Sequence, residues 1–151
     1  MFKKILLPCD GSKHSIEAAR VAAEIAAHHN GTVYPMVAVE YQYADSPELS
    51  EEVRGALHAR IQSRAGQALQ DVAGAVKQAG SGCTEGKVIE GPAAEAILKE
   101  AEDGEYDLIV MGSRGVSLDN GYDRLIGSVT ERVLHRALCP VLVIRHNANP
   151  K

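Results

Sequence analysis

Short apolar runs alternate with longer helical patterns along the whole chain, and this alternation restricts the fold most. Five runs have the length and composition of strands: residues 3–8, 32–39, 84–89, 106–111 and 140–144. Nearly continuous apolar runs are typical of a parallel sheet with helices on both faces, and parallel neighbours require crossover helices. Pro35 removes one backbone donor and predicts an irregularity there. The sequence therefore predicts an α/β fold with a single open five-stranded parallel sheet and one domain over residues 1–151.

Helix boundaries are indicated by capping residues between these runs. The first helix stops at Asn30, a good carboxyl-terminal cap before a glycine. The second is predicted to begin near Ser46 and Pro47, a cap residue followed by the residue best suited to the first helical position. The last is predicted to begin at Ser128, because Ser128 and Glu131 have the spacing of a capping box.

Composition and charge exclude several classes of partner. The net charge is -4 and no Lys/Arg-rich run is present, so we expect no binding to nucleic acid or to anionic membranes. The first residues contain too few apolar side chains for a signal-peptide core, and no apolar run approaches the ~20 residues of a membrane span. Cys9, Cys83 and Cys139 are widely spaced, as expected of buried thiols in a reducing compartment. We therefore expect a cytoplasmic protein.

Ligands of open α/β sheets bind outside the carboxyl ends of the strands, where two loops are unusual. The first, residues 8–12, places the Asp10 carboxylate just after the first strand. This carboxylate could accept hydrogen bonds from a ribose hydroxyl or an adenine amine. Asp10 and Ser12 could equally do no more than start the following helix, because Asp and Ser are common caps.

The second loop begins with GSRG at residues 112–115 and ends at Gly127 and Ser128 before the last helix. Glycines let backbone N–H groups approach an anion, and a helix amino terminus carries about half a positive charge. These properties suit a polyphosphate, although the glycines could merely turn the chain. The sequence has neither GxxxxGK[ST] nor GxGxxG after the first strand, which excludes a P-loop enzyme and an ordinary dinucleotide-binding domain.

Three segments resemble a known family. ILLPCDGSKHSIEAA, VMGSRG and GSVTERVLHRALCPVLVIR are similar, in this order, to the signature segments of universal stress proteins, and the match covers essentially the whole chain. The resemblance implies a Rossmann-like sheet of order 3-2-1-4-5 and an ATP site. It implies the following nucleotide-binding residues: Pro8 and Gly11 in the wall, Asp10 at ribose, the Val39 backbone at adenine, and Gly112, Gly115, Gly127 and Ser128 at the phosphates.

The sequence departs from the family pattern between Gly115 and Gly127, where eleven residues stand instead of the usual nine. Asp119 and Asp123 add negative charge to this loop. Arg114 and Arg124 could offset that charge at the phosphates, or an aspartate could hold Mg²⁺. We expect ATP, with or without Mg²⁺, as the bound nucleotide.

The expected function is that of an ATP-binding regulatory protein with an unidentified protein partner, and not an enzyme. A slow ATPase or phosphotransferase is the first alternative, but Ser113, Ser117 and Ser128 have no evident base. A dimeric stress protein that binds no nucleotide is the second. The resemblance also implies a homodimer through the last strand, whose apolar edge would otherwise invite aggregation. That strand consists of Pro140, Val141, Leu142, Val143 and Ile144.

Overall fold

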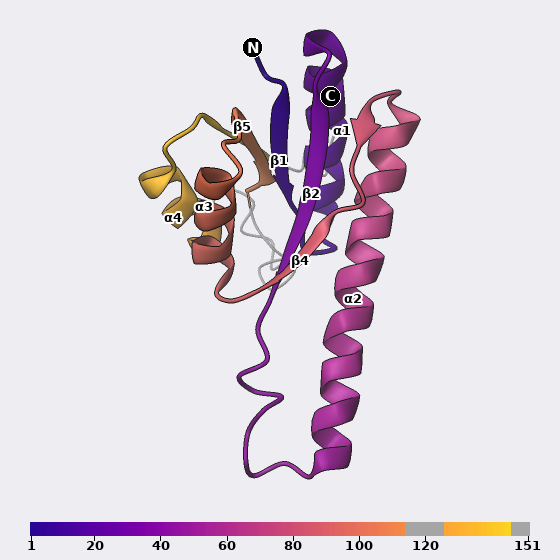
Figure 1. Ribbon diagram of the computed structural model, residues 1–151, viewed down its shortest axis with the longest axis vertical. Coiled ribbons are helices and arrows are strands. Elements are labelled where there is room, and N and C mark those ends of the chain that lie inside the picture. The colour runs from indigo at the N-terminus through magenta and orange to yellow at the C-terminus, as the bar shows by residue number, and fades with distance from the viewer. Residues whose placement is uncertain (114–125, 146–151) are drawn as a thin grey trace.

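The computed structural model describes residues 1–113 and 126–145, which build one parallel sheet between helices (Figure 1). The strands are β1 (Lys4–Pro8), β2 (Thr32–Val39), β3 (Gly82–Cys83), β4 (Lys87–Glu90), β5 (Leu108–Gly112) and β6 (Val141–Ile144). The helices are α1 (Lys13–His29), α2 (Glu51–Gln78), α3 (Ala93–Asp103) and α4 (Ser128–Arg136). The strand order is β3-β2-β1-β5-β6, and β4 also pairs with β2. The predicted α/β class is confirmed.

Both faces of the sheet are covered, as the apolar strands predicted. Ile5 and Leu7 of β1 pack with α1 and α2, whereas Leu6 packs with α3 and α4 on the other face. All three side chains are at most 1% exposed. Because successive side chains of a strand point to opposite faces, a continuous apolar run is needed when both faces are buried.

The sheet has six strands, so the predicted count of five is wrong. The expected third strand, residues 84–89, is only in part a strand: β4 begins at Lys87, residues 84–86 are in no strand, and a short β3 precedes them at residues 82–83. Both β3 and β4 pair with β2. Two residues of β2, Tyr34 and Pro35, lie opposite three residues, 84–86, of the interrupted neighbour. Pro35 cannot donate to a ladder, and Gly86 has a φ of +88°. The extra residue forms a bulge, which confirms the irregularity predicted at Pro35.

The second helix begins later than predicted. Its cap is Ser50, whose side chain accepts a hydrogen bond from the Val53 N–H, and its first residue is Glu51. Ser46 and Pro47 lie in the preceding turns. A start at Ser50 places Glu51 and Glu52 in the first turn of the helix. Negative side chains there interact favourably with the helix dipole and stabilise this start.

Helix α2 and the preceding loop extend past the carboxyl edge of the sheet (Figure 1). The helix has 28 residues, about 42 Å at 1.5 Å per residue. Tyr41 of the loop stacks on His58 with 4.3 Å between ring centroids. The Asp45 Oδ1 atom lies 2.5 Å from the His58 Nε2 atom. Among the described helices, α2 included, none is long and apolar enough to cross a membrane.

Candidate functional site

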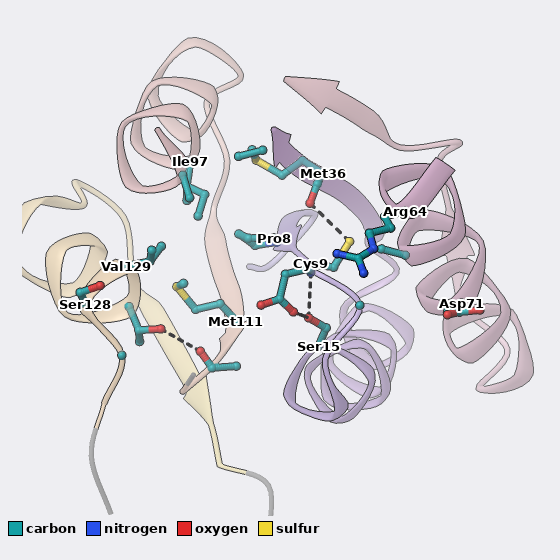
Figure 2. Close-up of a pocket in the computed structure, with 18 of the residues that line it drawn as sticks. Pro8, Cys9, Ser15, Met36, Arg64, Asp71, Ile97, Met111, Ser128 and Val129 are labelled. Carbon is teal, nitrogen blue, oxygen red and sulfur yellow. Dashed lines mark hydrogen bonds between the residues drawn. The ribbon is translucent and has the colours of Figure 1, made fainter. Parts of the chain in front are cut away.

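A cavity of about 740 Å³ opens at the carboxyl edge of the sheet. Its walls come from the ends of β1 and β5, the first turn of α4, the start of α3 and the middle of α2 (Figure 2). The lining residues are Pro8, Cys9, Asp10, Gly11, Ser15, Met36, Ala38, Arg64, Gln67, Ala68, Asp71, Ala93, Ile97, Met111, Gly112, Gly127, Ser128, Val129 and Thr130. This is the edge at which parallel sheets bind ligands.

The turn between β1 and α1 uses one oxygen of Asp10 to hold its own shape. Asp10 Oδ1 accepts hydrogen bonds from the Ser12 N–H at 2.9 Å and from Ser15 Oγ at 2.7 Å. The Ser12 hydroxyl caps α1 by accepting from the Ser15 N–H at 3.2 Å. Gly11 has a φ of +85°, which other residues rarely adopt. Within the described residues Asp10 Oδ2 accepts no hydrogen bond, so this exposed carboxylate can form the turn and still contact a ligand.

The first turn of α4 differs from the predicted capping box. Gly127 is the cap residue, with φ -65° and ψ 158°, and no side chain caps the helix. Ser128 is already the first helical residue, so its hydroxyl is displaced from the position a cap side chain needs. The Gly127 N–H donates to the Ser113 carbonyl, and the Glu131 N–H donates to the Gly127 carbonyl. The N–H groups of residues 128–130 therefore have no partner within the helix, and these residues line the cavity.

Two contacts fix α4 and α1 against the end of β5. Thr130 Oγ1 donates to the Gly112 carbonyl at 2.9 Å. A Cβ atom added to Gly112 would lie 2.5 Å from the His14 Cβ, so glycine is required there for the close approach of α1. Gly112 thus has a packing role whether or not it contacts a ligand.

The structure pairs Ser113 with a histidine that the sequence analysis did not connect to it. Ser113 Oγ lies 3.3 Å from His14 Nδ1, and the two residues are 3% and 8% exposed. Neither residue lines the cavity. The serine that has a nearby base is therefore not one of the groups that face the cavity.

Six of the nine predicted site residues line the same cavity: Pro8, Asp10, Gly11, Gly112, Gly127 and Ser128. Val39 does not line it; it is 7% exposed and its carbonyl accepts a hydrogen bond from the Gly91 N–H at 2.9 Å. Arg114 and Gly115 lie outside the described residues, as do Ser117, Asp119, Asp123 and Arg124.

Helix α2 contributes a wall that the sequence analysis missed. Arg64, Gln67 and Asp71 line the cavity and follow each other at spacings of three and four residues, which share one helix face. Gln67 Nε2 donates to Asp71 Oδ1 at 2.8 Å. The signal available in the sequence was a polar stripe bordering the buried Ala65 and Ala68, but nothing in the sequence indicated that this border faces a cavity.

Cys9 lines the cavity as a protonated thiol. Its Sγ donates to the Met36 carbonyl at 3.4 Å, and burial, followed by the nearby negative charge of Asp10, raises its pKa to about 12. Cys9, Cys83 and Cys139 are all free, and burial raises the pKa of each thiol. Among the described residues, no three His, Cys, Asp or Glu side chains are grouped to hold a metal ion.

Comparison with solved structures supports the fold assignment. The universal stress protein UspA from Lactobacillus plantarum superposes with a TM-score of 0.80 at 27% identity, covering 95% of this chain and 98% of that chain. The universal stress protein from Archaeoglobus fulgidus in complex with dAMP gives 0.66 at 20% identity, covering 96% and 100%. A universal stress protein in complex with cAMP gives 0.68 at 24% identity, covering 95% and 97%. At sequence identities this low, the last two structures show only that the fold is shared.

Sequence comparison identifies the family. A universal stress protein of Methanocaldococcus jannaschii is 37% identical over 149 residues, which cover 96% of this chain and 83% of that protein. A second, from Thermus aquaticus, is 34% identical over 147 residues, covering 96% and 100%. The family model of universal stress proteins matches residues 1–145. With this match over nearly its full length, the chain belongs to the universal stress protein family.

Proposed function

We propose that this protein binds ATP in the cavity at the carboxyl edge of the sheet and acts as a regulatory protein. The observation that carries the proposal is that the amino terminus of α4, which no side chain caps, lies in the same cavity as the Asp10 turn. A helix end with unpaired N–H groups and positive dipole charge suits phosphate oxygens, and a carboxylate oxygen suits ribose hydroxyls.

The rest of the cavity has room and chemistry for an adenine base. Its volume of about 740 Å³ lies within the roughly 300–1,000 Å³ of small-molecule sites. Met36, Ala38 and Ile97 supply an apolar wall beside the Pro8 turn, against which a planar base can pack. Fold neighbours from this family hold adenine nucleotides, namely dAMP in the Archaeoglobus fulgidus protein and cAMP in another, which supports the choice of base.

We propose a binding role rather than efficient catalysis. A phosphotransferase would need an acceptor with a base facing the γ-phosphate. Ser128 lines the cavity but forms no hydrogen bond with a described histidine, while Ser113 meets His14 outside it. Turnover should therefore stay far below the usual enzyme range of about 1–1,000 per second. Steady phosphate release near one per second from the purified protein would contradict this.

A thermal shift experiment tests nucleotide binding directly. Mg²⁺-ATP at millimolar concentration should raise the melting temperature, because a ligand that binds only the folded state stabilises it. Chromatography of the extract from denatured, freshly purified protein should also reveal adenine nucleotide. No shift and no retained nucleotide would favour the alternative of a family member that binds no nucleotide.

We also propose a cytoplasmic homodimer that pairs through β6 and signals to a protein partner. Within the described residues β6 pairs only with β5, so its other edge is unpaired, and Leu142 is 36% exposed. Self-pairing would satisfy the free backbone groups of this edge strand. Val143→Lys should dissociate the dimer, and light scattering at ~100 μM would measure it. A monomer mass for the parent protein would contradict this proposal.

A further inference from the structure

Arg64 on α2 is a charged group in the cavity that the proposed function does not use. Its neighbours in the polar stripe, Gln67 and Asp71, are hydrogen-bonded to each other. Arg64 forms no ion pair with any residue that the structure describes. Figure 2 shows its guanidinium reaching from α2 toward Cys9, so a cation without a described partner faces the cavity.

Arg64 lies next to the part of α2 that packs against the turn after β1. Ala65 and Ala68 are each 3% exposed, and a Cβ atom on Gly11 would lie 3.8 Å from the Ala68 Cβ. Arg64 lies beside Ala65 and about one helical turn before Ala68. Its buried neighbours on the same helix therefore place the arginine at the border of the cavity.

The arrangement of the walls indicates which part of a nucleotide Arg64 faces. In Figure 2 it lies on the opposite side of the cavity from Ser128 and Val129, where the α4 amino terminus would hold phosphates. Arg64 therefore faces the nucleoside end. Met36 of the apolar wall lies between Ile97 and Arg64 in the same view. A planar guanidinium across from apolar side chains forms a slot for a flat ring, because arginine stacks on aromatic faces.

We propose that Arg64 positions the bound nucleotide by stacking its guanidinium on the base. This inference rests on the proposed nucleotide binding and adds a residue of α2 to the site. The contact places α2 directly against the ligand, on the same helix as His58, which stacks on Tyr41 of the preceding loop. Loss of the guanidinium should weaken every ligand that carries the base, whatever its number of phosphates.

The test compares adenosine, AMP and ATP by titration calorimetry on the parent protein, Arg64→Ala and Arg60→Ala. Arg60 is the matched control, since it is an exposed arginine on the same helix that does not line the cavity. Both changes remove one positive charge and keep a good helix former. Arg64→Ala should weaken all three ligands by the same factor, about five- to tenfold, and Arg60→Ala should leave them unchanged. Circular dichroism verifies that both variants fold.

The alternative results separate this inference from the proposed function. Unchanged affinity of Arg64→Ala, with a parent protein that binds, would overturn the stacking contact alone. A loss that grows from adenosine to ATP would also overturn it, because Arg64 would then contact phosphates. No binding of any of the three ligands by the parent would overturn the proposed function and this inference together.

Discussion

The helices α1 and α4 both begin at the cavity, but they treat their first backbone donors differently. At α1 the Ser12 hydroxyl accepts from the Ser15 N–H, and Asp10 Oδ1 holds the turn. At α4 the cap is Gly127, which has no side chain to offer. The Ser12 side chain thus takes up one of the first N–H groups of α1, whereas no side chain takes up any at α4, so these remain for water or a ligand. This difference in capping supports the proposal that phosphates bind at α4 rather than at α1.

The largest effect on ATP binding is expected from giving α4 the side-chain cap that it lacks, which tests the difference between the two helix ends directly. Gly127→Asp should lower ATP affinity by about a hundredfold or more, because its carboxylate would occupy the helix end and repel phosphates. Stability should rise slightly, by a few tenths of a kcal/mol, since aspartate caps a helix better than glycine. Calorimetry and urea denaturation measure the two effects.

Gly127→Asn separates charge from occupancy at this position. Asparagine caps about as well as aspartate but carries no charge, so its loss of affinity should be smaller than that of aspartate. If Gly127→Asp binds ATP as tightly as the parent protein, the phosphates do not lie at α4.

A smaller effect is expected at the capped end, where Asp10 has one oxygen outside the turn. Asp10→Asn keeps an oxygen that can accept from the Ser12 N–H but removes the charge. ATP affinity should fall about tenfold, because hydrogen bonds to a charged acceptor are stronger than those to a neutral one. The melting temperature without ligand should fall slightly, because the two hydrogen bonds of the turn lose their charged acceptor as well. Equal ATP affinity would limit Asp10 to its structural role.

The cap of α1 should matter for stability and hardly for binding. Ser12→Ala removes the hydroxyl that accepts from the Ser15 N–H, and should lower the free energy of unfolding by about 1 kcal/mol. ATP affinity, measured at a temperature where the variant is folded, should stay within about twofold of the parent, roughly 0.4 kcal/mol. A large loss of affinity without a loss of stability would reverse the roles assigned to the two helix ends.

The smallest effect is expected from an aspartate at the opposite edge of the sheet. Asp107 Oδ2 accepts from the Lys4 and Lys3 N–H groups, each at 2.8 Å, and these bonds lower the Asp107 pKa. Because its pKa is lowered in the folded state, the Asp107 carboxylate stabilises the fold at pH values above the usual aspartate pKa of about 3.9. This stabilisation is lost as the pH falls through the pKa of the folded state. Asp107→Asn should be less stable than the parent at pH 6, and the difference should vanish in strong acid. Urea denaturation across this range measures it.

Much of the fold could be predicted because local patterns and burial agree. The apolar runs predicted every strand except the short β3, and the bulge at Pro35 follows from one missing donor. The exact strand count could not be predicted, because Gly86 can continue a strand or adopt a positive φ, and only its neighbour β2 decides which. The predicted cap of α2, Ser46, was wrong because Ser50 suits a helix start equally well, and the local sequence does not select between two serines so close together.

The sequence by itself determined the α/β class and the two loops that line the cavity, since periodicity, glycines and caps are local properties. Only the tertiary structure decided which donors those loops leave unpaired. It placed Ser128 inside α4 instead of at its cap, turned Ser113 toward His14, and brought Arg64 to the cavity. Each of these outcomes depends on how segments distant in the sequence pack against each other, and packing fixes the direction in which a side chain points.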